Sequence, residues 1–211
     1  MAYDLDEQEK LDSLKAWWSR YGIVVSTALL VVMAVLAGWQ GWRWYETHRA
    51  TQAMGYFEAL QEAAGQQGDE AAARIKAASQ TLRDDFAKTP YAPRGALVAA
   101  HALQVRGDVV GAREQLEWLV GIKDPALRPL ARLRLASLLL DQKEYDAALA
   151  QLSDAPQAFA ALYADRRGDV LAAQGKHEEA LAAWRGAVKE VPAGDPLASV
   201  LQLKIDALGG A

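Results

Sequence analysis

The sequence contains no cysteine and only three histidines among its 211 residues. Without a thiol the chain can form neither a disulfide nor the common cysteine-based zinc sites, and a lipoprotein anchor is excluded because its chemistry needs a thiol. The three histidines, His48, His101 and His177, lie far apart in the chain, and no pair has metal-ligand spacing. The sequence therefore predicts neither a metal site nor a cofactor.

Catalytic motifs are also missing. Gly168 and Gly175 resemble the glycines of a phosphate-binding loop only superficially, because they are seven residues apart instead of five and His177 stands where a magnesium-binding hydroxyl is needed. The sequence has no nucleophile elbow. Nothing in it supplies the third group that would orient His101 beside Ser137. We therefore expect no catalytic residues and no enzymatic activity.

Charge of one sign is not in large excess either. The chain has 23 Lys and Arg residues against 27 Asp and Glu residues, which gives a formal net charge of −4. It has no basic stripe of the kind that nucleic acid requires. The sequence therefore predicts no nucleic-acid partner.

The main feature that is present is an uncharged stretch from Tyr21 to Trp42. As a helix, at about 1.5 Å per residue, it spans about 30 Å, the thickness of the hydrocarbon core of a bilayer. Ser26 and Thr27 are expected to return their hydroxyls to carbonyls of the same helix. Aromatic rings that prefer the membrane interface flank the stretch: Trp17, Trp18, Tyr21, Trp39, Trp42, Trp44 and Tyr45. We predict a transmembrane helix over residues 21–45 in contact with a lipid bilayer.

A cleavable signal peptide is the alternative interpretation, because Val35-Leu36-Ala37 fits the small-residue rule of a cleavage site. Residues 1–20 argue against it, since they carry five acidic side chains and three basic ones whereas a signal peptide begins with a short basic region. Slightly more Lys and Arg precede the span than follow it. This bias predicts a cytoplasmic tail over residues 1–20 and a domain over residues 46–211 outside the cytoplasm, in the periplasm of a Gram-negative bacterium.

Small residues within the span lie four residues apart, in the pairs Ala34 and Gly38, and Ala37 and Gly41. This spacing lets the backbone of another helix approach closely. Small residues are also frequent in membrane helices in general. Two interpretations therefore stay open. Either another helix packs in the membrane at Ala34, Ala37, Gly38 and Gly41, or these residues reflect only the usual composition of membrane helices.

The remaining residues are rich in Ala, Leu, Gln, Glu and Arg and have no alternating β-branched runs, which predicts an all-α domain. Three turns in it, at Gly107, Lys143 and Gly175, are 36 and 32 residues apart. Each turn is followed five residues later by an alanine, namely Ala112, Ala148 and Ala180. The pattern resembles the tetratricopeptide repeat, with Lys143 in place of the turn glycine of the second copy.

This resemblance implies a solenoid of helical hairpins. The repeats are expected at residues 94–128, 129–160 and 161–192, and the third copy matches best because it also has Gly168 and Trp184. A degenerate repeat over residues 46–93 precedes them, with Gly68-Asp69 as its turn and Ala73 where its helices cross. A capping helix over residues 195–208, with Asp195 as its N-cap, closes the stack.

Stacked hairpins form a curved surface whose inner wall comes from the first helix of each pair. The repeat alignment places on this wall a candidate protein-binding surface of Arg94, Leu97, His101, Gln104, Leu130, Leu133, Ser137, Leu140, Asp165 and Asp169. For Leu133 and Leu140, burial in the stack is an equally good interpretation. Trp118 points away from its own hairpin, so it is either an interaction anchor or a filler of the gap to the neighbouring repeat.

At family level the layout resembles the YfgM-type ancillary subunit of the bacterial Sec translocon. The resemblance covers nearly the whole chain and includes Leu14-Lys15-Ala16-Trp17-Trp18 at the membrane entry, Gly41-Trp42-Arg43-Trp44-Tyr45 at the exit, and the closing Leu201-Gln202-Leu203-Lys204-Ile205-Asp206. It implies a single-pass inner-membrane protein with a periplasmic repeat domain. It also implies association with SecYEG and with a membrane-anchored chaperone of the PpiD type.

The sequence and this resemblance together lead to one functional hypothesis and one alternative. We expect a scaffold or co-chaperone that holds partner proteins, or unfolded polypeptides emerging from the translocon, by apolar contact. The alternative is a membrane-anchored adaptor for envelope assembly or cell division.

Overall fold

The computed structural model describes the backbone of residues 2–122, 124–192 and 194–209, with side chains described from residue 9 onward. Within these ranges the regular structure is helical and no strand occurs. The acidic side chains of Asp4, Asp6 and Glu7, and the ends of the expected tail and domain at residues 1 and 210–211, lie outside what is described. The prediction of an all-α fold is confirmed.

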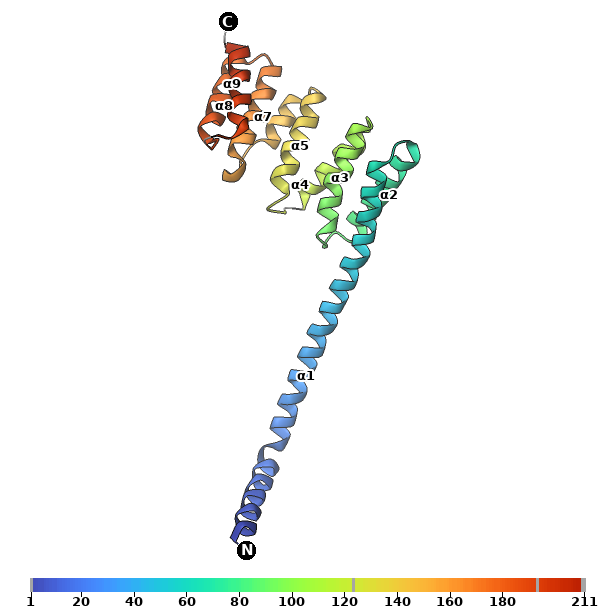
Figure 1. The fold of residues 1–211 in the computed structure, drawn as a ribbon, viewed down its shortest axis with the longest axis vertical. Helices are drawn as coiled ribbons and strands as arrows, with labels where there is room; N and C mark the ends of the chain where they lie inside the picture. The colour runs from blue at the N-terminus through green and yellow to red at the C-terminus, as the bar shows by residue number, and fades with distance from the viewer. Residues whose placement is uncertain (1, 123, 193, 210–211) are drawn as a thin grey trace. The chain divides into compact units, whose positions relative to one another are not determined.

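The helices follow one another with short connections (Figure 1). They are α1 (Ala2–Gly65), α2 (Asp69–Asp85), α3 (Tyr91–Val105), α4 (Val109–Gly121), α5 (Arg128–Asp141), α6 (Tyr145–Gln151), the 3-10 helix η1 (Gln157–Phe159), α7 (Ala160–Ala173), α8 (His177–Glu190) and α9 (Pro196–Gly209). The chain divides into two compact units, one ending at Thr51 and one beginning at Gln52.

The first unit is a single helix with a fully exposed apolar surface. Every residue from Ile23 to Leu36 is exposed, and Ile23 alone has 84% of its surface accessible. The Thr27 hydroxyl donates to the Ile23 carbonyl at 2.8 Å, as expected for a polar side chain in lipid. α1 is long and apolar enough to cross a membrane, and we describe it as the N-terminal transmembrane helix.

Aromatic and basic side chains pair along α1 on both sides of the apolar segment. At the C-terminal end of the apolar segment, the Arg43 guanidinium lies 4.9 Å from the centre of the Trp39 ring. Trp44 stacks on His48 with ring centres 5.5 Å apart. At the N-terminal end of the apolar segment, the Trp18 ring covers Gly22. A β-carbon at residue 22 would lie 3.1 Å from this ring. Such amphipathic groups favour the headgroup level.

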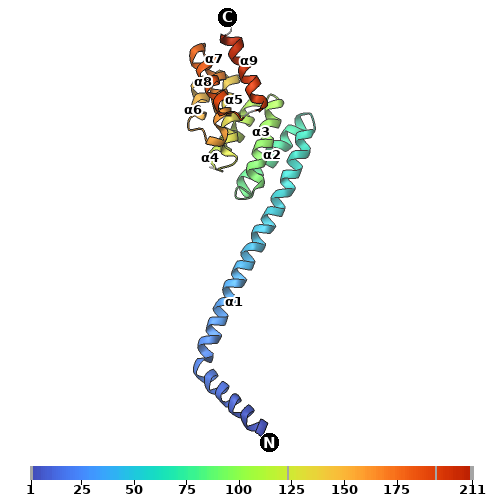
Figure 2. The same cartoon turned by 60° about the vertical axis from the view of Figure 1, so that its left-hand side comes forward.

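The second unit is a stack of helical hairpins with a core that runs along its length. The main contacts between hairpins join successive ones, through α2 and α3, through α4 and α5, and through α5 and α7, as expected for a solenoid. In both views α7, α8 and α9 lie together at the C-terminal end (Figures 1 and 2). The three larger core clusters are represented by Leu60, Ile75 and Leu103, by Leu116, Leu139 and Tyr163, and by Leu171, Leu181 and Leu201, and a smaller one contains Ala96, Leu119 and Ala131.

The three repeat turns have the same geometry. Gly107, Lys143 and Gly175 have positive φ angles of 78°, 61° and 78°. In each turn the next residue donates its N–H to a leucine carbonyl five residues back, at 2.9 to 3.0 Å, on Leu103, Leu139 and Leu171. This is the Schellman arrangement, which satisfies helix carbonyls that would otherwise lack a donor. The alignment of the three turns is confirmed, and Lys143 occupies a position that favours glycine.

The expected crossing residue of the first hairpin is wrong. Ala73 is exposed, whereas Ala71 and Ile75 are buried. Gly68, with φ of 97°, directly precedes α2, while one residue, Asp108, separates Gly107 from the first residue of α4. The shorter turn starts α2 one residue earlier, which rotates Ala73 out of the core.

The closest helix crossing lies in the third repeat. The Trp184 indole N–H donates to the Asp165 carbonyl at 3.1 Å, and the ring lies directly on Gly168. A β-carbon at residue 168 would lie 2.3 Å from the indole nitrogen. Glycine at this position therefore allows α7 and α8 to pack against each other.

Polar side chains hold the end of α6 and join the second repeat to the third. The Tyr163 hydroxyl donates to the Pro129 carbonyl at 3.0 Å, and burial raises the pKa of Tyr163 above its ordinary value, so it remains a donor. Arg132 and Arg167 donate to the Ser153 and Leu152 carbonyls at 2.7 and 2.8 Å. These two carbonyls follow the short helix α6, whose end they help to hold.

The capping helix begins as expected. The Asp195 carboxylate accepts the Leu197 N–H at 2.9 Å, which confirms it as an N-cap. Leu201 is completely buried against α8. The outward face of α9 remains apolar, since Val200 and Leu203 are exposed.

We predict that Lys143→Gly stabilises the repeat domain. A left-handed backbone costs a non-glycine residue roughly 1–2 kcal/mol in the folded state, and glycine removes this cost. The greater conformational freedom of glycine in the unfolded state offsets part of the stabilisation. The free energy of unfolding should rise by about 0.5–1 kcal/mol. Urea unfolding of the detergent-solubilised chain, followed by far-ultraviolet circular dichroism, measures it. Lys143→Ala is the control and should give no gain; equal stability of the two variants would contradict the turn geometry.

We predict opposite effects for two glycine-to-alanine changes in the third repeat. Gly168→Ala should cost about 1–2 kcal/mol, because overpacking against Trp184 outweighs the better helix propensity of alanine. Gly186→Ala in α8 meets nothing within 4 Å and should stabilise by about 0.5–1 kcal/mol. Hydrogen exchange of α7 and α8 amides in the full chain measures both. Equal protection in the two variants would be inconsistent with the close crossing.

Candidate protein-binding site

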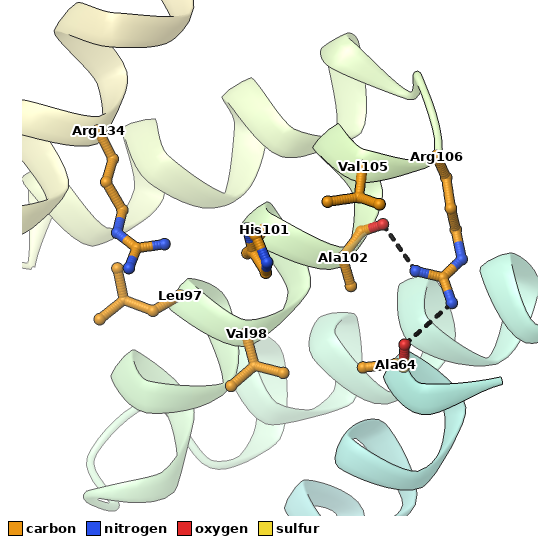
Figure 3. Close-up of a pocket in the computed structure, with 8 residues that line it drawn as sticks. All are labelled: Ala64, Leu97, Val98, His101, Ala102, Val105, Arg106 and Arg134. Carbon is orange, nitrogen blue, oxygen red and sulfur yellow. Dashed lines mark hydrogen bonds between the residues drawn. The ribbon is translucent and has the colours of Figure 1, made fainter.

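A cavity of about 360 Å³ lies on the face formed by the first helices of successive hairpins. It is bounded by the C-terminal end of α1, by α3 and by α5 (Figure 3). Its lining residues are Ala64, Leu97, Val98, His101, Ala102, Val105, Arg106 and Arg134. The volume is within the range of side-chain-sized and small-ligand pockets.

The helical period of α3 explains why these side chains gather. His101 follows Leu97 by four residues and Val98 by three, and Val105 follows His101 by four, so these side chains share one face. The opposite face of α3 carries the small buried residues that pack into the core, such as Ala99. Val105 has 72% of its surface exposed, which is unusual for an apolar side chain without a partner.

Arg106 closes one side of the cavity. Its guanidinium donates to the Ala102 carbonyl at 2.8 Å and to the Ala64 carbonyl at 3.1 Å, and it also contacts the carbonyls of Ala63 and Gln66. These carbonyls belong to the end of α1, where a cation is favourable. Arg106 therefore holds α1 and α3 together and keeps the edge of the cavity in place.

Arg134 occupies the other side. It is exposed on α5, and its guanidinium extends toward Leu97 and His101 (Figure 3). Among the described side chains, no carboxylate forms an ion pair with Arg134, nor with Arg94 one turn before Leu97. Both cations are therefore available to a ligand.

The carboxylate that follows α3 is already engaged. Asp108 accepts the Gly111 N–H at 3.0 Å as the N-cap of α4 and pairs with Lys76 of α2 at 2.6 Å. The hydrogen bond from Lys76 and the one from Gly111 hold the pKa of Asp108 below its usual range. Asp108 therefore stays ionised and joins α2 to α4 instead of neutralising the cavity.

The expected binding surface is only partly brought together. Leu97 and His101 line the cavity, and Arg94 and Gln104 are exposed on the same helix. On α5, the expected residues are Leu130, Leu133, Ser137 and Leu140, and none of them lines the cavity. Leu133 and Leu140 are half-buried against the second core cluster, and the Ser137 hydroxyl donates back to the Leu133 carbonyl at 3.0 Å.

The acidic part of the expected surface is covered. Lys204 of α9 donates to Asp165 at 2.6 Å and to Asp169 at 2.7 Å. Asp165 is buried. The expectation that Asp165 and Asp169 face an open groove is therefore wrong, because the capping helix places its own lysine over them.

Trp118 fills space between repeats. It is half-buried and packs against the first core cluster and against the small cluster of Ala96, Leu119 and Ala131. This contact favours the gap-filling interpretation over that of an interaction anchor.

Six cavity residues were not expected from the sequence: Ala64, Val98, Ala102, Val105, Arg106 and Arg134. Helical spacing could have placed both valines on the surface, since Val98 lies four residues after Arg94 and Val105 lies four residues after His101. No pattern in the sequence indicates that Arg134 lines the cavity, because the sequence does not show which side of α5 faces α3. The orientation of Arg106 depends on the end of α1, far away in the chain.

Neither a metal site nor a partner for the membrane helix is seen in the described parts of the chain. These residues contain no cluster of His, Asp or Glu able to hold a metal ion. Ala34, Ala37, Gly38 and Gly41 are exposed, and a β-carbon at either glycine would meet nothing within 4 Å. Transmembrane packing at these residues stays a prediction.

Comparisons with known proteins agree on one family. A family model described as a tetratricopeptide repeat-like domain matches residues 15–210. The chain is 34% identical to the ancillary SecYEG translocon subunit of Neisseria gonorrhoeae, over 99% of this chain and 100% of the relative. It is 26% identical to the protein of the same name in Escherichia coli, over 96% and 97% of the two chains. The Haemophilus influenzae protein is 26% identical, over 83% and 85%. No solved structure matches.

Proposed function

The chain belongs to the family of ancillary SecYEG translocon subunits, and we propose that it is a membrane-anchored scaffold and co-chaperone of protein export. In this role it stands beside the SecYEG translocon and binds partner proteins, or polypeptides that have just crossed the membrane, on the wall formed by α1, α3 and α5. Its partners are SecYEG, a chaperone of the PpiD type and unfolded translocated polypeptides.

The observation that carries this proposal is the cavity between α1, α3 and α5. Its floor is apolar, with Leu97, Val98 and Val105 accessible to a ligand. An unfolded polypeptide exposes apolar side chains that a folded protein hides, and their burial in such a cavity drives association without covalent chemistry. This is what a holding function requires, and no catalytic group is needed for it.

The proposed location follows from α1 and from the family. The helix contains one apolar segment long enough to cross a bilayer, and the relatives are named as subunits of a membrane translocon. We propose a single pass through the bacterial inner membrane, with the N-terminus in the cytoplasm and the repeat domain in the periplasm. The slight excess of Lys and Arg before the span supports this orientation.

The binding proposal is tested by photocrosslinking in intact membranes. A photoreactive amino acid in place of Val105, in the cavity, should form adducts with newly translocated polypeptides, with SecYEG or with a PpiD-type chaperone. The same amino acid in place of Arg185, which is exposed on α8, is the matched control and should give few adducts with unfolded chains. Exclusive capture of cell-division or cell-wall proteins would replace the proposal by the adaptor hypothesis.

The orientation is tested with single cysteines, because the chain has none of its own. Ser199→Cys on α9 should react with a membrane-impermeant maleimide in cells whose outer membrane has been permeabilised. Ser13→Cys should react only after the inner membrane is opened. Both serines are exposed. Reaction of Ser13→Cys before lysis, with Ser199→Cys protected, would reverse the proposed orientation.

A further inference from the structure

The cavity is cationic although the chain is acidic. Arg106 and Arg134 are among its lining residues, and the lining contains no Asp or Glu. The whole chain has 27 acidic residues against 23 Lys and Arg residues. The local excess of positive charge is therefore a property of this site and not of the protein surface in general.

The two arginines of the lining have different roles. Arg106 is occupied by the carbonyls at the end of α1. Arg134 has no carboxylate partner among the described side chains, and its guanidinium extends over Leu97 (Figure 3). Arg94, on the same face of α3 and one turn before Leu97, is exposed as well. Of the two guanidinium groups that border the apolar floor, only that of Arg134 can therefore still accept a carboxylate.

The carboxylates that might have neutralised them are held elsewhere. Asp108 pairs with Lys76, Glu144 pairs with Arg113, and Asp169 pairs with Lys204. Each of these contacts joins different helices of the stack. These three carboxylates are thus paired with other cations, and Arg134 is free to bind a carboxylate of a ligand.

From this charge pattern we infer that the cavity selects polypeptide segments in which an apolar side chain lies next to an Asp or Glu side chain. The apolar side chain enters between Leu97, Val98 and Val105, and the neighbouring carboxylate binds the Arg134 guanidinium. A guanidinium offers two parallel N–H donors to a carboxylate, which makes this pair more directional than one with lysine. The inference rests on the proposed function and specifies which segments of an unfolded chain are held.

The test uses the full chain in nanodiscs of zwitterionic lipid, so that lipid charge does not compete. Three fluorescent peptides, acetylated and amidated at their ends, differ only in having Glu, Gln or Lys beside a single Phe. The Glu peptide should bind about three- to tenfold more tightly than the Gln peptide, and the Lys peptide should bind least. Added salt should reduce the difference, because the Arg134 pair is exposed.

Variants separate the charge from the apolar contact. Arg134→Gln should abolish the preference for the Glu peptide over the Gln peptide. Arg134→Glu should make the Lys peptide the tightest. Val105→Ser should weaken all three peptides alike. Arg185→Gln on α8 removes the same charge away from the cavity and should change nothing. Circular dichroism checks that each variant is folded.

The outcomes distinguish this inference from the proposed function. Equal binding of the Glu and Gln peptides, or an equal effect of Arg134→Gln and Arg185→Gln, overturns the inference and leaves holding of apolar segments intact. Tighter binding of a peptide with a free C-terminal carboxylate and no Glu would mean that chain ends are recognised instead, which also overturns it. Failure of all three peptides to bind, together with no adducts from residue 105, overturns both.

Discussion

Burial of apolar side chains between successive helical hairpins is the interaction on which the rest of the domain depends. No single hairpin can cover its own apolar face, so each relies on the next. The three leucines that precede the turns, Leu103, Leu139 and Leu171, are buried, and their carbonyls close the turns. The same residues therefore end one helix, reverse the chain and fill the core. This repetition sets the first helices side by side and creates the wall on which the cavity lies.

The first and last hairpins of the stack are covered in different ways. This difference decides where a ligand can bind. Near the start, Arg106 fastens the end of α1 to α3, and the space beside it stays open. Near the other end, α9 lies against the last hairpin, and Lys204 occupies Asp165 and Asp169. The open cavity therefore lies between α1, α3 and α5, where the lining contains Arg106 and Arg134 but no Asp or Glu.

We infer that a protein with this architecture acts by binding other molecules while its helix holds it at the membrane. Its apolar segment interacts with lipid along one helix, and its repeat domain offers an apolar cavity with exposed guanidinium groups. Weak binding suits the proposed co-chaperone role, because a polypeptide that has just crossed a membrane must be released to fold. An exposed ion pair adds selectivity at little cost in release rate, since its contribution is small and screened by salt.

The sequence alone determined the features that depend on neighbouring residues in the chain. The membrane helix, the positions of the three repeat turns and the cap at Asp195 are encoded by local composition, φ preference and hydrogen bonding. Leu97 and His101 could be assigned to the wall because helical periodicity is local too. Tertiary structure decided the rest: the rotation of Ala73 out of the core, the packing of Trp118, the covering of Asp165 and Asp169, and the position of Arg134. Each depends on contacts between segments far apart in the chain, and a shift of one residue or the presence of a capping helix changes which side chain reaches solvent.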